Sequence, residues 1–182
     1  GSEMCIRDSR YTRGIAEFVS KLRYEDIPPE VLTRIKLCML DSLGCAIYGA
    51  DLEWTRIMQQ SLGAVDTTRA CTIWGTNKKL SAPHAALING AVVLPALISI
   101  AEMRPGMNGK EFLAAAVAGY EIGPRVGICM GPEHIAQGWH SGATLGVYSA
   151  ASGAARGLKL DVDKTVHALG VAGTQAAGLM AA

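Results

Sequence analysis

The fold is decided by the stretch Gly138-Trp139-His140-Ser141-Gly142-Ala143-Thr144-Leu145-Gly146-Val147-Tyr148-Ser149-Ala150-Ala151. Beyond its histidine, this stretch consists almost entirely of small residues and carries no charge. A helix without charge on any side belongs in a protein interior, and small side chains let a neighbouring helix approach closely. The stretch therefore predicts a buried helix that begins near His140, continues to about Arg156 and ends at Gly157.

The overall composition also favours packed helices. The chain has 182 residues, enough for one domain with a hydrophobic core, and 49% of them are hydrophobic. Only 5% are aromatic whereas 21 residues are glycine, so the core must be built from aliphatic and small side chains. Such a core suits close helix packing better than a β-sandwich. The expected fold class is all-α.

Apolar residues recur with the helical period along most of the chain. β-prone residues are confined to 70–74, too short a segment for a sheet-based fold. The expected N-caps are Ser81, Asn108 and Asp161. The predicted helices are 12–22, 29–48, 54–62, 82–102 (with Gly90 and Pro95 inside it), 110–128 (kinked or ended early by Pro124), 140–156 and a last helix from Asp161.

The charge pattern argues against nucleic-acid and membrane partners. The 17 basic and 16 acidic residues nearly balance, and this leaves no basic surface for nucleic acid or anionic lipid. Two uncharged runs, Leu80–Ala101 and Ile135–Ala155, are long enough to span a bilayer. Both contain histidine and other polar residues and lack aromatic belts, so we expect buried helices instead.

The two ends of the chain lack the signals of a complete ordered domain. Residues 1–9 show no periodicity and no apolar signal-peptide segment, so we expect a non-native or disordered leader before a helical domain at 10–182. The chain stops at Ala182 within apolar, small-residue sequence that has no helix stop signal. We therefore expect an incomplete domain, whose exposed apolar surface causes aggregation.

No motif in the sequence indicates a metal or cofactor. The five cysteines (5, 38, 45, 71 and 129) form no CxxC pair, and the four histidines are too scattered for a zinc site. Gly142-x-x-x-Gly146 follows no strand, so we interpret it as a close-packing device. We expect inert core thiols, with Cys38 and Cys45 on a buried helix face, in a reducing cytoplasmic setting.

Among the titratable side chains, His140 is the main candidate for chemistry. An imidazole at a helix start can serve as a structural hydrogen-bonding group or as a general acid/base. The residues alone favour the structural role, because no catalytic partner is visible in the sequence.

The other polar candidates have simpler interpretations. His84 and His167 fall in predicted helices, and we expect core or surface roles for both. His134 lies in a predicted loop beside an acidic residue and is expected to be solvated. Asp41, within an apolar stretch, is expected to be buried and hydrogen-bonded, and Lys78-Lys79 to form a solvated turn.

Five segments resemble the MmgE/PrpD family, in the same order along the chain. They cover nearly everything from Thr12 to the end, and the ordered set is more specific than any one segment. They are Asp41–Ala46; Trp74-Gly75 with Leu80–Gly90; Gly109–Leu113 with Ala118–Ile122; Gly138–His140 with Ala143–Gly146; and Ala168–Ala176 with Gly178-Leu179.

The resemblance implies a large all-α domain, of which this chain is the N-terminal part, and a smaller lid domain that is absent here. It implies a homodimer that removes water or carbon dioxide from small di- and tricarboxylates, of the 2-methylcitrate or cis-aconitate type, without metal or cofactor. It assigns acid/base catalysis to His140, with Trp139 and Thr144 as candidate substrate-binding neighbours.

The chain departs from the family at Asn89–Pro95, where the two sides of an Asp- and His-rich family loop are joined directly. This departure leaves three alternatives: an inactive piece of a lyase, an epimerase of the same family, or a catalytically dead helical protein for dimerisation or partner binding. We expect no measurable turnover from these 182 residues alone.

Overall fold

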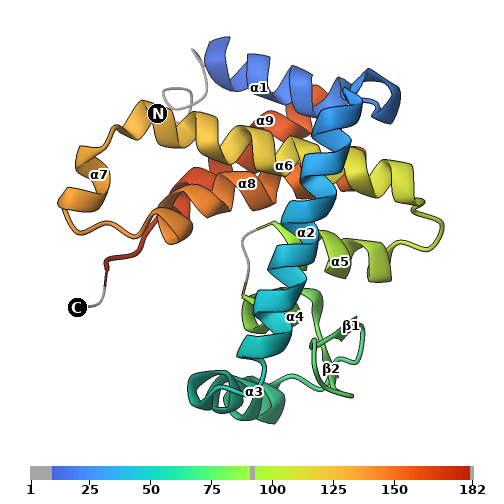
Figure 1. The fold of residues 1–182 in the computed structure, drawn as a ribbon, viewed down its shortest axis with the longest axis vertical. Helices are drawn as coiled ribbons and strands as arrows, with labels where there is room; N and C mark the ends of the chain where they lie inside the picture. The colour runs from blue at the N-terminus through green and yellow to red at the C-terminus, as the bar shows by residue number, and fades with distance from the viewer. Residues whose placement is uncertain (1–9, 91–92, 181–182) are drawn as a thin grey trace, which may run out of the picture.

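A computed structural model describes residues 10–90 and 93–180 of the protein (Figure 1). The expected leader at 1–9 lies outside the described residues, and so does Ala91 of the Gly90–Ala91 junction. The all-α expectation is confirmed within the described ranges. The helices are α1 (Arg10–Lys21), η1 (Tyr24–Asp26), α2 (Pro29–Gly49), α3 (Glu53–Val65), α4 (Ala82–Asn89), α5 (Leu94–Met103), α6 (Gly109–Met130), α7 (Glu133–Ala136), α8 (Ser141–Gly157) and α9 (Val162–Thr174).

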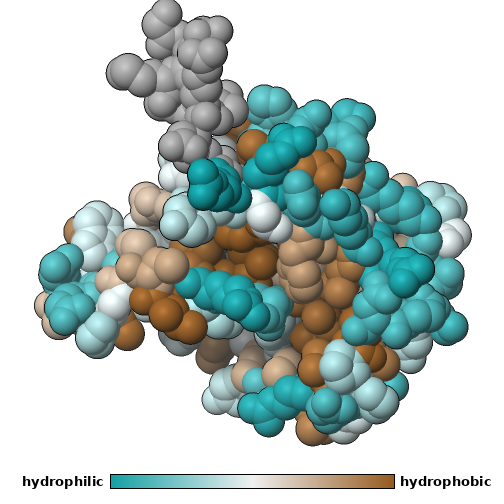
Figure 2. All heavy atoms as spheres, turned by 90° about the horizontal axis from the view of Figure 1, so that it is seen from above, coloured by the Kyte–Doolittle hydropathy of each residue, from teal (hydrophilic) through white to brown (hydrophobic). Residues whose placement is uncertain are grey.

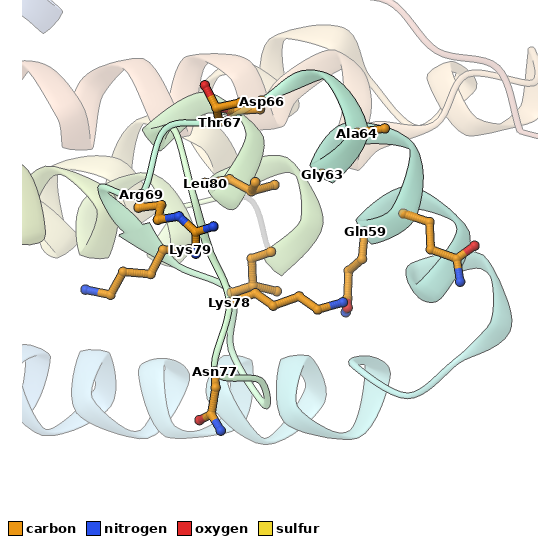
Figure 3. Close-up of a pocket in the computed structure, with 12 residues that line it drawn as sticks. Gln59, Gly63, Ala64, Asp66, Thr67, Arg69, Asn77, Lys78, Lys79 and Leu80 are labelled. Atoms are coloured by element: carbon orange, nitrogen blue, oxygen red, sulfur yellow. The ribbon is translucent and has the colours of Figure 1, made fainter.

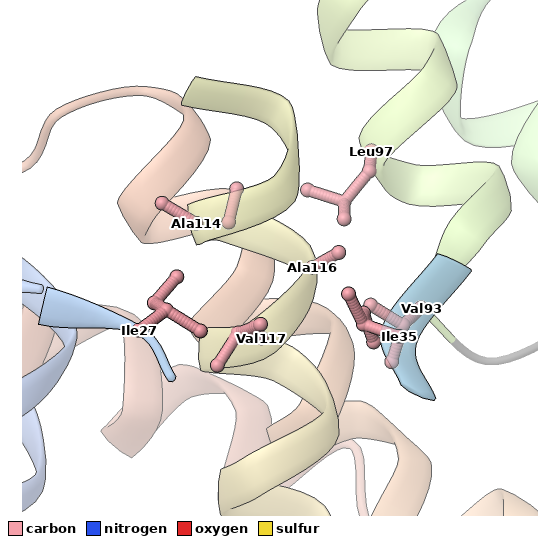
Figure 4. Packing of buried hydrophobic residues seen from close by; sticks show 8 residues of the cluster. Ile27, Ile35, Val93, Leu97, Ala114, Ala116 and Val117 are labelled. Atoms are coloured by element: carbon pink, nitrogen blue, oxygen red, sulfur yellow. The ribbon is translucent and has the colours of Figure 1, made fainter. Parts of the chain in front are cut away.

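The centre of the fold is the pair α6 and α8, which make the most extensive contact between described elements. Figure 1 shows them side by side, with α1 and α9 next to them and α2 crossing α6. The small residues predicted to pack do so: a Cβ on Gly153 would lie 3.3 Å from the carbonyl oxygen of Ala115. The buried cluster around this pair includes Ile35, Val93 and Leu97 (Figure 4).

Pro124 does not end its helix early, because α6 continues through it to Met130. Proline in a helix interior removes one backbone hydrogen bond. Pro124 is exposed, while the opposite face of α6 is buried against α8 through residues such as Ala118 and Ile122. We conclude that tertiary packing holds the helix together across the proline.

The helix expected over 82–102 is wrong as a single element. Gly90 adopts a left-handed conformation (φ 74°) and caps α4, and Pro95 lies in the first turn of α5. Glycine after a helix end and proline at a helix start are the preferred positions of these residues. Both residues therefore mark a break between two helices.

A small satellite lies at one end of α2. It contains α3, α4 and an antiparallel hairpin of β1 (Cys71–Thr72) and β2 (Lys79–Leu80) (Figure 1). Only β1 lies in the predicted β-prone segment 70–74. Ile73, Leu80 and Ile88 form its own buried cluster. This satellite contacts the central helices through α5.

Apolar side chains are also found at the surface. Figure 2 shows apolar residues open between hydrophilic margins on one face. Large exposed hydrophobic residues include Leu40, Tyr48, Trp54 and Ile128.

One described helix, α6, is long and apolar enough to cross a bilayer by composition, but it is the central packing helix here. Such a composition is also that of a buried core helix.

Candidate functional site

His140 caps the N-terminus of α8, as its position before the small-residue stretch predicts. Its Nδ1 accepts a hydrogen bond from the backbone N–H of Ala143 at 3.1 Å. The same N–H also donates to the carbonyl oxygen of His140 at 3.0 Å. The ring therefore satisfies a helix-end donor, which is the usual task of a cap residue.

This hydrogen bond fixes the tautomer of the neutral ring. A nitrogen that accepts carries no proton, so the proton of neutral His140 lies on Nε2. The side chain is exposed, and within the described residues its only hydrogen bond is through Nδ1, so Nε2 can meet a ligand. Because the Ala143 N–H has a second acceptor, the ring can leave the cap position without leaving that donor unpaired.

The chain near its C-terminus holds the segment before α8 in place. The N–H of His140 donates to the carbonyl of Gly178 at 3.0 Å, and the N–H of Met180 donates to Gly138 at 2.7 Å. Gly178 has φ 145°, and a Cβ there would lie 2.5 Å from the Cβ of Ala143. Only glycine permits this close approach beside the first turn of α8.

His134 is buried, so the expectation that it is solvated is wrong. Its side chain is 7% exposed, and its Nε2 lies 2.7 Å from Oγ1 of Thr144. The Thr144 hydroxyl in turn donates to the carbonyl of His140 at 3.1 Å. Since that hydroxyl uses its hydrogen on the carbonyl, Nε2–H of His134 is the donor to Thr144. Trp139 stacks on the His134 ring at 6.3 Å between centroids.

Trp139 and Thr144, the two predicted neighbours of His140, therefore have structural contacts within the protein. Thr144 is buried and links His134 to the start of α8, while Trp139 is 38% exposed and covers His134. Their role in substrate binding stays a prediction. The sequence analysis did not identify His134 as a buried residue of this site. The available signal was Gly138, which follows a short helical segment and can turn the chain back toward α8.

The structure has two sizeable cavities. One, of about 560 Å³, lies in the satellite, and the second, of about 500 Å³, adjoins the first turns of α8. Apolar and hydroxyl groups line this second cavity, and the Ser42 and Tyr120 hydroxyls in it are 3.0 Å apart. Ser141 and Gly142, which follow His140, form part of its wall. Val93 also lines it, so it reaches the segment where the family loop is expected.

The remaining polar candidates are placed apart from His140. His84 donates from Nδ1 to Asp66 at 2.6 Å in the satellite, and His167 is exposed on α9. Asp41 is exposed, so its predicted burial is wrong: it lies on the outer side of α2. No group of three metal-ligating side chains occurs in the part of the chain that the structure describes.

The cysteines are partly as expected. Cys71 is fully buried, and burial raises the pKa of its thiol, so it is an inert core residue. Cys45 is exposed and Cys38 only partly buried, so the buried face expected for both is wrong. The reason is that α2 contacts the core along one narrow side, near Ile35.

Comparisons with known proteins agree with this architecture. The model of the MmgE/PrpD N-terminal domain matches residues 13–93 and 90–182, two segments that overlap at residues 90–93. A cis-aconitate decarboxylase-like protein oryM of Aspergillus oryzae is 33% identical over 98% of this chain and 44% of its own length.

Two further relatives carry a similar name. The cis-aconitate decarboxylase of Aspergillus terreus is 33% identical over 96% of this chain and 41% of its own length. The human cis-aconitate decarboxylase is 25% identical over 93% of this chain and 40% of its own length. The chain thus spans less than half the length of the curated relatives it matches. Because the family model matches nearly all of it, the chain belongs to the MmgE/PrpD family, whose N-terminal domain it represents.

Proposed function

We propose that this chain is part of a lyase that removes carbon dioxide from a small tricarboxylate of the cis-aconitate type, with His140 as the acid/base. The observation that carries the proposal is the position of His140: an exposed imidazole with a defined tautomer, one residue before the wall of a 500 Å³ cavity. The relatives named cis-aconitate decarboxylase support the reaction class.

The chemistry requires one proton. When the bond between carbon and a carboxylate breaks, carbon dioxide leaves and the electron pair stays on carbon, which must then be protonated. A protonated His140 supplies that proton from Nε2 and is left neutral with its remaining proton on Nδ1. Proton exchange with solvent then restores the Nε2–H tautomer observed at the cap. The positive end of the α8 dipole, at the first turn of the helix, also favours a substrate carboxylate nearby.

Dehydration of a 2-methylcitrate-type acid is the other lyase reaction that these groups can serve. There, neutral His140 turns out of the cap and takes a proton from carbon on Nδ1, and the imidazolium then returns a proton to the departing hydroxyl group, which leaves as water. The same residue therefore suits both reactions, and the cavity walls do not distinguish them. The names of the relatives favour decarboxylation.

One observation favours the alternative of a catalytically dead helical protein. The family model matches this chain as two segments that meet at residues 90–93, where the Asp- and His-rich loop of the family is expected. If that loop is missing from the protein, His140 lacks partners, and these residues serve dimerisation or partner binding instead.

The test begins with the source coding region, read across Gly90–Ala91 and past Ala182. The complete gene product is then assayed with cis-aconitate and 2-methylcitrate, beside His140→Ala and the control His167→Ala on exposed α9. General acid/base catalysis contributes about 10²–10⁴ in rate, so His140→Ala should lose at least about 100-fold and the control nothing. Equal activity of His140→Ala and the parent would refute the assignment. A complete gene product that lacks the loop and turns over neither acid supports the dead protein.

A further inference from the structure

The cavity in the satellite lies away from His140, between α3 and the hairpin. It has a volume of about 560 Å³, within the usual range for small-molecule sites. Its lining includes three basic side chains, Arg69, Lys78 and Lys79, and a single carboxylate, Asp66. Figure 3 shows Arg69 and Lys78 directed toward the centre of this region and Lys79 directed away from it.

Asp66 makes no ion pair with Arg69, Lys78 or Lys79, because other donors already occupy its oxygen atoms. Its Oδ2 accepts from the Ser81 N–H at 2.9 Å, from the Ser81 hydroxyl at 2.6 Å and from His84 at 2.6 Å. Its Oδ1 accepts from the N–H of Thr68 at 2.9 Å. The two Ser81 hydrogen bonds hold the pKa of Asp66 well below its usual range, so it stays charged and engaged.

The cations themselves have no acidic partner. None of Arg69, Lys78 and Lys79 lies within 4.0 Å of a carboxylate among the residues that the structure describes. Most exposed basic residues in a protein are merely solvated, so this alone would mean little. Here, however, they border a cavity rather than a convex surface.

The hairpin fixes the backbone positions of Arg69 and Lys78. The N–H of Ala70, next to Arg69, donates to Leu80 at 3.2 Å, and the carbonyl of Lys78 accepts from Ile73 at 3.0 Å. These two bonds fix the backbone beside the two basic positions, which lie just before β1 and just before β2. The backbone at both positions is thus set before any ligand arrives, which lowers the entropy cost of binding.

The opposite wall supplies neutral hydrogen-bonding groups. Gln59 of α3 is 8% exposed and lines the cavity, where Figure 3 shows its side chain next to that of Lys78. One N–H of its amide donates to the carbonyl of Ala50 at 3.4 Å, which leaves the second N–H for a ligand. Asn77 and Gln60 complete the polar lining. A guanidinium, an ammonium and side-chain amides together suit an oxyanion, because all of them donate hydrogen bonds.

We propose that this cavity binds a small oxyanion with at least two negative charges, held by Arg69 and Lys78. The site is separate from the proposed catalytic one, since it is formed by α3 and the hairpin and not by α8. Phosphates and polycarboxylates share this chemistry, so the experiment must distinguish them.

The experiment titrates the complete gene product with pyrophosphate and, separately, with citrate in an isothermal calorimeter at low salt. The test variant is Arg69→Gln with Lys78→Gln. The control is Arg34→Gln with Lys36→Gln, two exposed basic residues of α2. Lys79→Gln tests the orientation seen in Figure 3. Circular dichroism confirms that each variant is folded.

We expect one probe to bind, its affinity to fall roughly tenfold or more in the test variant, and little change in the control or in Lys79→Gln. The probe that binds more tightly identifies the ligand class. His140→Ala should bind the anion as the parent does, whatever its activity. The proposal is overturned if neither probe binds, if the control loses as much as the test variant, or if His140→Ala abolishes binding.

Discussion

The closest approach of the two central helices gives a sharp test of the fold. Gly119 lies in the middle of α6 and faces α8. A Cβ at this position would stand 2.7 Å from Cγ1 of Val93 and 2.8 Å from the backbone carbonyl oxygen of Ser149. The valine can rotate, but the carbonyl belongs to the backbone of α8. Gly119→Ala must therefore move one central helix away from the other.

The expected cost follows from two opposing effects. Overpacking a tight core costs typically ~1–3 kcal/mol, and a clash with backbone places Gly119→Ala at the upper end of that range. Replacing glycine by alanine inside a helix returns about 1 kcal/mol of helix propensity. The free energy of unfolding should thus fall by roughly 2 kcal/mol. For a chain of this size, such a loss lowers the melting temperature by about 4–8 °C.

Gly44→Ala is the matched control. Gly44 lies in the interior of α2, and a Cβ there would meet nothing within 4 Å. The same substitution should therefore stabilise the protein by up to about 1 kcal/mol, through helix propensity alone. Urea unfolding followed by circular dichroism measures both variants. A Gly119→Ala protein as stable as Gly44→Ala would show that α6 and α8 do not pack as described.

Three further results are expected. Replacing His140 by Ala should lower the free energy of unfolding by about 0.5 kcal/mol, the low end for a lost cap, because the Ala143 N–H keeps its bond to the backbone carbonyl of residue 140. Asn is a good N-cap and should cost less; urea unfolding measures both variants. Asp66 has a lowered pKa in the folded state, so its contribution to stability is present above the unfolded value near 4 and is lost as the pH falls below it. Asp66→Asn should hence be less stable at pH 7 and should flatten the acid limb of a stability profile measured from pH 7 to 2; an unchanged acid limb would contradict this. Gly178→Ala should destabilise the protein by at least ~1 kcal/mol in thermal unfolding, because its backbone conformation and the nearby Ala143 both exclude a side chain.

Local sequence signals were sufficient for most of the helices. These signals act within one or two helical turns. They are the helical period, Pro29 at a helix start, and the caps Asn108 and Asp161, all of which the structure places as expected. Ser81 occupies the predicted N-cap position, yet its hydroxyl donates to Asp66 instead of capping α4. Asp66 lies 15 residues before Ser81 in the sequence, and no local pattern predicts this contact.

The candidate site was harder to predict for the same reason. His140 was found because the small-residue helix begins directly after it. His134 was not found, because its burial depends on a turn through Gly138 that brings two rings together. The exposure of Asp41 was missed because an apolar stretch in a helix does not reveal which side meets the core.

The structure shows why the two hypotheses for His140 need not compete. As a cap, the ring accepts from the Ala143 N–H and is held as the tautomer with its proton on Nε2. As an acid/base, it must carry a second proton on Nδ1, and it then gives up that acceptor role. The Ala143 N–H keeps its bond to the carbonyl of His140 during this change, so this donor is not left unpaired. The cap thus sets the resting orientation of the ring without preventing proton transfer. For the same reason, loss of activity in His140→Ala with retained activity in His140→Asn would contradict the proton-transfer role, since asparagine can cap the helix but cannot carry the proton.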